Sequence, residues 1–525
     1  MTVKRYTKYT TRLMTVNNKK KHTDRTFLSL LVVCILLIII SGYISLKNNF
    51  PLKPGKASDG SALSGILVRS SENPGIFFDI HGFLKGSKCY IFLPESADTS
   101  NLGFYTTDAD GNIINRYNHD FTEDPLEIDG IEIITMESDL PVINLNLYPN
   151  YPSLEELESS NDHHTRTKAD FKMDNPDGSF TEGIIEMRGR GNTSWQEDKK
   201  SYQIKFEKKT NLLDMGAAKS WILLANAGDY SLLRNEVFLD LARDLDLPYT
   251  SELEEVNLFI NGEYRGAYSL AEKVEVGRER VHIEDGDYLY RIGMDPDKYS
   301  FLAYTNPFAE GEGNFKKLYG ELRNSKDSMV IHRSEKYLKE AMNELYNSNS
   351  DLSLIDMESL AKYYWLQEFS KTTDPTGRSV YLLWSASNQK MYVGPAWDYD
   401  RTAGIIDMPF LEEDYIWPNG WTARVRDYYV PLFKNPRFIA AINDTYENGG
   451  VKEAFRRTAE SIPERVERMS CAAEMNFIRW DIPREENNQV YYAYHDTSWC
   501  SQTAWLHDWL SLRCDFIEKE MSEMH

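Results

Sequence analysis

The sequence has few cysteines, no surplus of positive charge, and no internal repeat or low-complexity run. Its five cysteines have a spacing that resembles no zinc site. Lys and Arg number 59 against 81 Asp and Glu, and the net charge of −22 argues against nucleic acid as a partner, because a polyanion would be repelled. At 41% apolar and 13% aromatic residues, the chain has the material for real cores, which excludes wholesale disorder.

The charge is distributed unevenly. Residues 1–26 hold eight Lys and Arg against one acid, and the next twenty residues, Phe27 to Leu46, carry no charge. As a helix this stretch would be about 30 Å long, one hydrocarbon thickness. We expect 1–26 to be a basic cytoplasmic segment and 27–46 a single-pass transmembrane anchor, with the C-terminal domains outside the membrane.

Two alternatives to the anchor stay open. A cleaved signal peptide would have a shorter apolar core, and no small-x-small cleavage site follows Leu46. A buried helix of a soluble protein is rarely so uniformly apolar. Outside the membrane disulfides are allowed, and one pair among Cys471, Cys500 and Cys514 is as compatible with the sequence as free buried thiols.

The rest of the chain divides into three parts. Residues 47–65 form a polar linker that contains Gly, Ser and Pro. Residues 66–150 alternate short apolar runs with turns and predict a small β domain of sandwich type. Residues 151–525 mix strand and helix patterns and end in a helical tail, so the fold class is α+β.

The order of elements in this last part is that of a protein-kinase-like fold. A strand enters a Gly-containing loop, and a second strand, a helix, a hairpin, more helices and a second hairpin follow. Local strings are also similar to the CotH kinase family, the spore-coat-protein-H-like atypical protein kinases. The strings are RGRGNTSW (188–195), KKSYQIKF (199–206), LLANAGDYSLLRNEVFLDLAR (223–243), LFINGEYRGAYSLAEKV (258–274) and GPAWDYD (394–400).

The resemblance implies a set of nucleotide-binding residues. RGRGNTSW is expected to cover the nucleotide, with Arg188, Arg190 and Asn192 near the phosphates. Lys205 stands where such a fold puts its phosphate-holding lysine, on the third strand, with Lys199 and Lys200 as rivals.

Further residues of the same set come from later strings. Arg234 and Asn235, in the LLRN string, are expected to contact phosphate or the nucleotide-covering loop, and the neighbouring Glu236 is a weaker candidate to pair with the lysine. Glu272 lies in the segment that resembles the hinge, where a buried carboxylate that caps the segment is the structural alternative.

The resemblance also implies the residues that carry chemistry. Asp374 matches the catalytic aspartate that accepts the proton of the substrate hydroxyl, although Asp-Pro-x-Gly is also a good turn. Asp398 matches the metal-binding aspartate, and Asp400 would share its face if the preceding strand continued. Ser379 stands where the pattern wants an Asn as second metal ligand.

Three functions fit these residues. The first is a membrane-anchored atypical protein kinase that uses ATP with Mg²⁺ or Mn²⁺ and acts on Ser or Thr of a surface or spore-coat protein. The second is a non-catalytic surface or coat-assembly protein that keeps the kinase-like fold as a binding module, which Ser379 and the acidity favour. The third, a two-carboxylate glycoside hydrolase, leaves RGRGNTSW and Lys205 without a role.

Overall fold

The structure is a computed structural model that describes most of the chain after residue 62. The described residues are 63–161, 163–175, 178–191, 193–306, 316–373, 375–406, 415–481, 491–492 and 498–523. The basic segment, the expected anchor at 27–46 and most of the linker therefore lie outside them. Within those ranges, no helix has the length and apolar character needed to span a bilayer.

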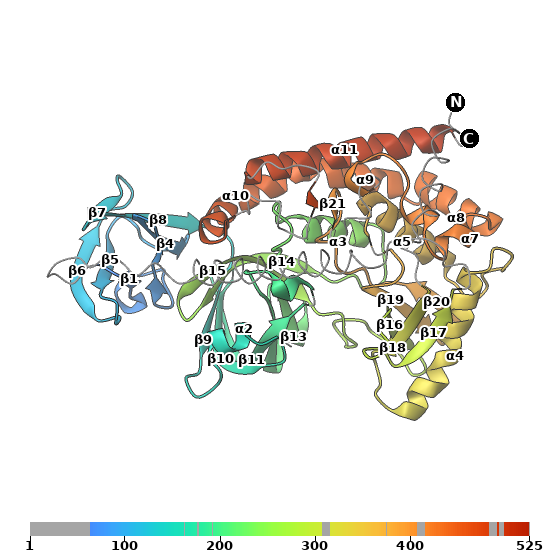
Figure 1. Ribbon diagram of the computed structural model, residues 1–525, viewed down its shortest axis with the longest axis horizontal. Coiled ribbons are helices and arrows are strands. Elements are labelled where there is room, and N and C mark those ends of the chain that lie inside the picture. Colours follow the sequence, from blue (N-terminus) through green and yellow to red (C-terminus); the bar gives the residue numbers. More distant parts are fainter. Residues whose placement is uncertain are drawn as a thin grey trace, which may run out of the picture. The chain divides into compact units, whose positions relative to one another are not determined.

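An N-terminal β-rich part begins the described chain, in blue in Figure 1. Strands β1, β2, β5 and β6 pair in one sheet, and β3, β4, β8 and β7 pair in another. Ile66, Phe92 and Phe104, all nearly inaccessible to solvent, belong to the core of this part. The strands are β1 (Gly65–Val68), β2 (Ile80–His81), β3 (Phe83–Lys85), β4 (Lys88–Pro94), β5 (Leu102–Thr107), β6 (Ile113–His119), β7 (Leu126–Ile128) and β8 (Ile131–Ser138).

Seven strands follow and form a sheet that closes on itself, which we call the closed sheet (Figure 1). Their order is β13-β12-β11-β10-β9-β14-β15, and β13 pairs again with β15. Alternate residues such as Ile204, Trp221 and Tyr268 fill its interior and are fully buried. The strands are β9 (Val142–Leu147), β10 (Arg166–Asp174), β11 (Phe180–Arg190), β12 (Ser201–Asn211), β13 (Ala217–Leu224), β14 (Leu253–Ile260) and β15 (Glu263–Glu272).

The predicted hairpin joins β14 to β15. Asn261 and Gly262 both have positive φ angles, 53° and 77°, as a two-residue hairpin turn requires. A Cβ on Gly262 would lie 2.2 Å from the carbonyl oxygen of Asp79, so the turn also needs glycine for space. β9 pairs with β10 and β14, so the residues at the end of the expected 66–150 domain belong to the closed sheet.

Helix α3 (Arg234–Asp244) follows β13, and a second sheet follows β15. That sheet has the order β17-β18-β16-β19-β20. Its strands are β16 (Tyr288–Gly293), β17 (Phe301–Thr305), β18 (Lys317–Leu322), β19 (Val380–Ser385) and β20 (Lys390–Val393). Two short strands, β21 (Ile405–Ile406) and β22 (Tyr491–Tyr492), pair separately.

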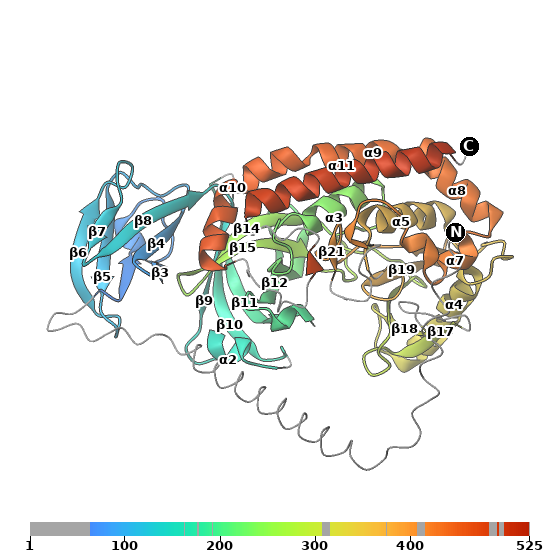
Figure 2. The ribbon, with the colours of Figure 1, turned by 45° about the horizontal axis from the view of Figure 1, so that its top comes forward.

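Helices complete the C-terminal part, as Figure 2 shows from a second direction. The large apolar core packs α3 with these helices and the second sheet. Arg513 and Glu368 form an ion pair at 3.0 Å with both side chains inaccessible to solvent, which ties α11 to α5. The helices are α2 (Leu154–Glu158, in a loop of the closed sheet), α4 (Ser328–Leu345), α5 (Met357–Ser370), α7 (Tyr429–Leu432), α8 (Pro436–Glu447), α9 (Val451–Glu460), α10 (Ile462–Arg479) and α11 (Trp499–Glu523).

The cysteines of the described chain form no disulfide. Cys471, Cys500 and Cys514 in the tail are all free thiols, and so is Cys89. The three tail thiols are thus free, but the expectation that they are buried is wrong, because Cys471 and Cys500 are exposed and Cys514 is partly exposed.

Candidate functional site

A cavity of about 710 Å³ lies between the closed sheet and the segment that follows β20. On one side it is lined by the ends of β11 and β13 and the start of β12, and on the other by residues 397–401 and part of α5. Such a volume suits a small-molecule ligand. We call it the acidic-loop cavity, because Asp398 and Asp400 both line it.

The RGRGNTSW string ends β11 and turns into the cavity. Arg188 and Arg190 are half-buried, and both line the cavity. Arg190 lies over the ring of Trp397, with its guanidinium carbon 5.3 Å from the ring centroid. The glycines of the string serve packing and turning: a Cβ on Gly189 would lie 2.4 Å from the Trp195 ring, and Gly191 has a φ of 115°.

Asp398 projects its carboxylate at the cavity. Its side chain is exposed, and Ser379 Oγ donates a hydrogen bond to Asp398 Oδ2 at 2.6 Å. The backbone φ of Asp398 is 78°, a left-handed conformation that non-glycine residues rarely adopt and that is concentrated at functional sites. β20 ends at Val393, so strand alternation does not align Asp398 with Asp400, although both reach the same cavity.

Helix α3 holds the segment that carries these acids. Asn235 Oδ1 accepts a hydrogen bond from the backbone N–H of Tyr399 at 2.9 Å. Arg234 donates from Nε to the carbonyl of Thr402 at 2.9 Å and from Nη2 to the carbonyl of Ala403 at 3.0 Å. The acidic loop is therefore fixed from behind by α3.

Arg234 was expected to contact either phosphate or the nucleotide-covering loop, and the structure has it instead on the segment that carries Asp398 and Asp400. Its guanidinium is buried and forms an ion pair with Asp229 at 2.5 Å, with side-chain exposures of 1% for both. Arg234 is absent from the residues that line the acidic-loop cavity, so it positions the acidic loop and does not contact a ligand there.

Two other carboxylates have structural partners. Glu272 forms an ion pair with Arg280, and its Oε2 accepts a hydrogen bond from the backbone N–H of Glu252 at 3.0 Å. It thus matches the alternative of a carboxylate that caps the hinge segment. Glu236 pairs with Arg465 at 2.6 Å and with Arg468, both on α10, so the expected pairing with a strand lysine is wrong.

Two of the lysines expected to hold phosphate line different cavities. Tyr202 and Ile204 face the interior of the closed sheet, and Gln203 and Lys205 face outward, as the alternation of β12 predicts. Lys205 lies on the second strand of the run β11-β12-β13, not the third, and it lines a neighbouring cavity. Its rival Lys199 is buried and lines the acidic-loop cavity.

A chain of hydrogen bonds leads from the acidic loop to a buried acid. Asn235 holds the backbone of Tyr399 and donates to Asn226 Oδ1 at 3.0 Å. Asn226 donates to Ser269 Oγ at 2.7 Å, and Ser269 donates to Glu255 Oε1 at 2.6 Å. Burial raises the pKa of Glu255 to about 8, so this carboxyl is mainly protonated at neutral pH.

The charges around Glu255 set the direction of a pH dependence. Glu236 also raises its pKa, whereas the hydrogen bond from Ser269 and the charges of Arg468 and Lys199 lower it. Burial lowers the pKa of Lys199 to about 7. The folded chain therefore keeps a proton on Glu255 between pH 4.5 and 8 that the unfolded chain has released, and stability falls as pH rises through that window.

We expect Glu255→Gln to abolish the fall in stability that accompanies deprotonation of Glu255. Because glutamine is neutral at every pH, the variant should gain at least about 2 kcal/mol of unfolding free energy relative to the unmutated chain between pH 5 and pH 8. The charge of Glu255 raises the pKa of Lys199, so in the variant Lys199 releases its proton at a lower pH, and the rise in stability that follows adds to the difference in the same direction. Denaturant unfolding at the two pH values measures the difference, with the exposed Glu263→Gln as control. Parallel profiles for Glu255→Gln and the unmutated chain would contradict the assignment.

Several lining residues were not predicted from the sequence. Tyr299, Tyr381 and Trp397 give the acidic-loop cavity aromatic walls, and His163 and Arg291 also line it. Arg291 and Tyr299 lie between the recognised strings, so no motif indicated them. His163 also lies outside the recognised strings, whereas Trp397 stands inside the GPAWDYD string itself.

Two predicted residues, Asp374 and Asn192, lie outside the described residues. Thr372 and Thr373, which directly precede Asp374 in the chain, line the cavity. Over the described ranges, no cluster of three or more His, Cys, Asp or Glu side chains could hold a metal ion. Mg²⁺ in nucleotide sites is held by one or two carboxylates together with phosphate oxygens, which Asp398 and Asp400 fit.

Comparison with known proteins gives one finding. A family model described as CotH kinase protein matches residues 187–517, which run from β11 to α11 and include every element that lines the acidic-loop cavity except His163. None of the curated proteins compared with the chain matches it.

Proposed function

The chain belongs to the CotH kinase protein family, and from this premise we propose that it is a membrane-anchored atypical protein kinase that transfers the γ-phosphate of ATP to Ser or Thr of a surface or spore-coat protein. Family membership suggests kinase activity, and a kinase implies ATP. The protein substrate, the anchor at 27–46 and the extracytoplasmic location of the C-terminal domains are parts of the proposal that rest on the sequence.

One observation carries the proposal: the acidic-loop cavity brings together cations, carboxylates and aromatic walls. Arg188 and Arg190 suit phosphate oxygens, because guanidinium groups make paired charge-assisted hydrogen bonds to them. Trp397 and Tyr299 supply the aromatic walls, with Arg190 over the ring of Trp397 and Arg291 over the ring of Tyr299. Asp398 is held in a left-handed conformation at the cavity.

In the proposed reaction this chain orients groups and moves one proton. ATP with Mg²⁺ or Mn²⁺ supplies the phosphoryl group and neutralises charge on it. Asp398 and Asp400 hold the cation, and α3 keeps their segment in place through Asn235 and Arg234. Asp374 accepts the proton of the substrate hydroxyl. Ser379 stands where an Asn was expected, and its hydroxyl donates a hydrogen bond to the carboxylate of Asp398.

The full chain in detergent micelles, incubated with labelled ATP and Mg²⁺ or Mn²⁺, tests the proposal. We expect calorimetry to detect nucleotide binding and label to pass to an added Ser-rich protein or to the chain itself. Absence of nucleotide binding in the unmutated chain would contradict the proposed kinase activity. Nucleotide binding without any transfer leaves the non-catalytic binding module, and release of sugar from glycans without an effect of ATP favours the glycoside hydrolase.

A further inference from the structure

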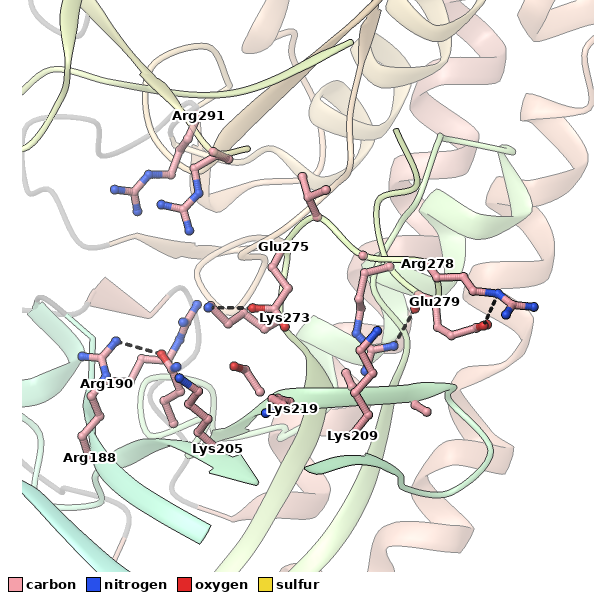
Figure 3. Close-up of a pocket in the computed structure, with 18 of the residues that line it drawn as sticks. Arg188, Arg190, Lys205, Lys209, Lys219, Lys273, Glu275, Arg278, Glu279 and Arg291 are labelled. Atoms are coloured by element: carbon pink, nitrogen blue, oxygen red, sulfur yellow. Dashed lines mark hydrogen bonds and ion pairs between the residues drawn. The ribbon is translucent and has the colours of Figure 1, made fainter. Parts of the chain in front are cut away.

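A second cavity, of about 660 Å³, adjoins the acidic-loop cavity and is strongly basic. Eleven Lys and Arg side chains and two Glu side chains line it, in a chain whose net charge is −22. Figure 3 shows Arg188, Lys205 and Lys209 extending from the strands of the closed sheet, with Arg291 on the opposite side. We call it the basic cavity.

Six of the eleven cations already have acidic partners. Lys273 pairs with Glu275 at 2.9 Å, and Arg278 pairs with Glu279 at 3.2 Å (Figure 3). Arg166, Arg280, Arg291 and Arg323 pair with glutamates outside the cavity lining. Pairing of this kind is the usual state of clustered cations in a folded protein.

The other five cations have no ion pair with any residue in the described ranges. They are Arg188, Arg190, Lys205, Lys209 and Lys219. Arg188 donates to Gln203 Oε1 at 2.8 Å, and Lys219 donates to the carbonyl of Glu207 at 2.7 Å, so both meet neutral acceptors only. Burial and Arg188 lower the pKa of Arg190 whereas Asp398 raises it, and the three lysines are exposed, so the repulsion among the five cations is partly screened. An anion in the cavity relieves the repulsion that remains.

The cavity wall also contains buried donors without partners. Nε and Nη2 of Arg280 are buried, and no described group accepts a hydrogen bond from them. The same holds for Nε of Arg291 and of Arg323, which lie across the cavity from β12. Because solvent does not reach these atoms, an acceptor oxygen meets them only when the guanidinium groups shift, so they add hydrogen-bonding capacity to the cavity wall without marking where a ligand lies.

The geometry points to a phosphorylated segment of the protein substrate as the occupant of the basic cavity. A phosphomonoester carries almost two negative charges and three acceptor oxygens, and guanidinium groups match it better than they match a single carboxylate. The basic cavity and the acidic-loop cavity share Arg188, Arg190 and Arg291, so a chain held in one continues into the other. This inference rests on the proposed function, since phosphate on Ser or Thr is the product of that reaction.

The consequence is that phosphorylation favours neighbouring sites. A segment that has received one phosphate docks that group in the basic cavity and presents a second hydroxyl to the acidic-loop cavity. Serines that lie close to an existing phosphoserine are then modified faster than isolated ones.

Binding of a labelled peptide to the full chain in detergent micelles, without nucleotide, tests the inference. The probe carries two phosphoserines, and the reference peptide carries serine at both positions. We expect fluorescence anisotropy to show at least about tenfold tighter binding of the phosphopeptide, which corresponds to one or two charge-assisted hydrogen bonds. Equal affinities for the two peptides overturn the inference.

A pair of matched variants locates the site. Lys209→Gln with Lys219→Gln removes two charges from the basic cavity, and Lys208→Gln with Lys434→Gln removes two exposed charges that do not line it. The first variant should lose most of the preference for phosphopeptide, and the second should keep it. Affinity for a fluorescent ATP analogue should be unchanged in both. Retention of the preference in the first variant would show that the phosphate binds elsewhere.

Inorganic pyrophosphate separates a substrate segment from a free anion. We expect it to displace the phosphopeptide only at concentrations well above those at which the phosphopeptide itself binds. Displacement at equal or lower concentrations would assign the cavity to a small free phosphate compound and overturn the inference. These measurements contain no ATP, so they can be interpreted even if the chain does not bind nucleotide. Failure to bind nucleotide would contradict the proposed kinase reaction but would not affect the result for the basic cavity.

Discussion

Asp398→Asn should lower phosphoryl transfer by roughly a thousandfold, equivalent to about 4 kcal/mol of transition-state stabilisation. The carboxylate is exposed at the acidic-loop cavity and lies in the segment that α3 holds, and in the proposed reaction it would hold the cation that accompanies ATP. Asparagine keeps the shape of the side chain and tolerates the φ of 78° at this position, and it removes only the charge. The rate of label transfer from ATP measures the effect.

The design separates loss of the cation from loss of the fold. The melting temperature of Asp398→Asn should match that of the unmutated chain, because an exposed carboxylate contributes little to stability. Nucleotide affinity measured with Mg²⁺ should fall to the value measured with chelator. Asp139→Asn, an exposed acid outside the cavity, serves as the matched control and should retain full activity. More than a tenth of the activity remaining in Asp398→Asn would contradict the assignment of the metal site.

The sequence predicted the local elements well, because each depends on neighbouring residues. The alternation of SYQIKF indicated which residues of β12 face inward, and Asn261-Gly262 indicated the hairpin. Four of the five family strings contribute residues to the acidic-loop cavity, whereas Arg291, Tyr299 and the lining residues of α5 lie outside the strings. These features follow from periodicity and turn chemistry, which a single stretch of sequence contains.

Long-range pairing was not predictable in the same way. The closure of the sheet depends on β13 meeting β15, strands separated by α3 and β14. The partners of Glu236 come from α10, more than 220 residues later in the chain. The basic cavity brings together Arg188, Lys219 and Arg323 from distant parts of the chain. The net charge of the whole chain is negative, so composition gives no sign of this local positive charge. No local sequence pattern specifies contacts between residues so far apart in the chain. The ion pairs and the basic cavity could therefore be identified only from the folded structure.

Arg234→Met should lower the free energy of unfolding by about 3–5 kcal/mol, because it leaves the carboxylate of Asp229 buried without a countercharge. Denaturant unfolding measures the loss. Arg457→Met is the control: Arg457 pairs with Asp244 at 3.2 Å, but both side chains are about half exposed, and such surface pairs are worth less than about 1 kcal/mol. A loss for Arg234→Met no greater than that of the control would contradict the role of the buried pair.

A double variant distinguishes stability from positioning. Asp229→Asn combined with Arg234→Met removes both charges and keeps a side-chain oxygen as acceptor for the buried N–H groups of Ser231 and Arg234, so most of the lost stability should return. Activity should not return with it, because the carbonyls of Thr402 and Ala403 still lack the donors that hold the acidic loop. Nucleotide affinity in the presence of Mg²⁺ should stay low in the double variant while its unfolding midpoint recovers. Recovery of both together would show that Arg234 stabilises the fold without positioning Asp398.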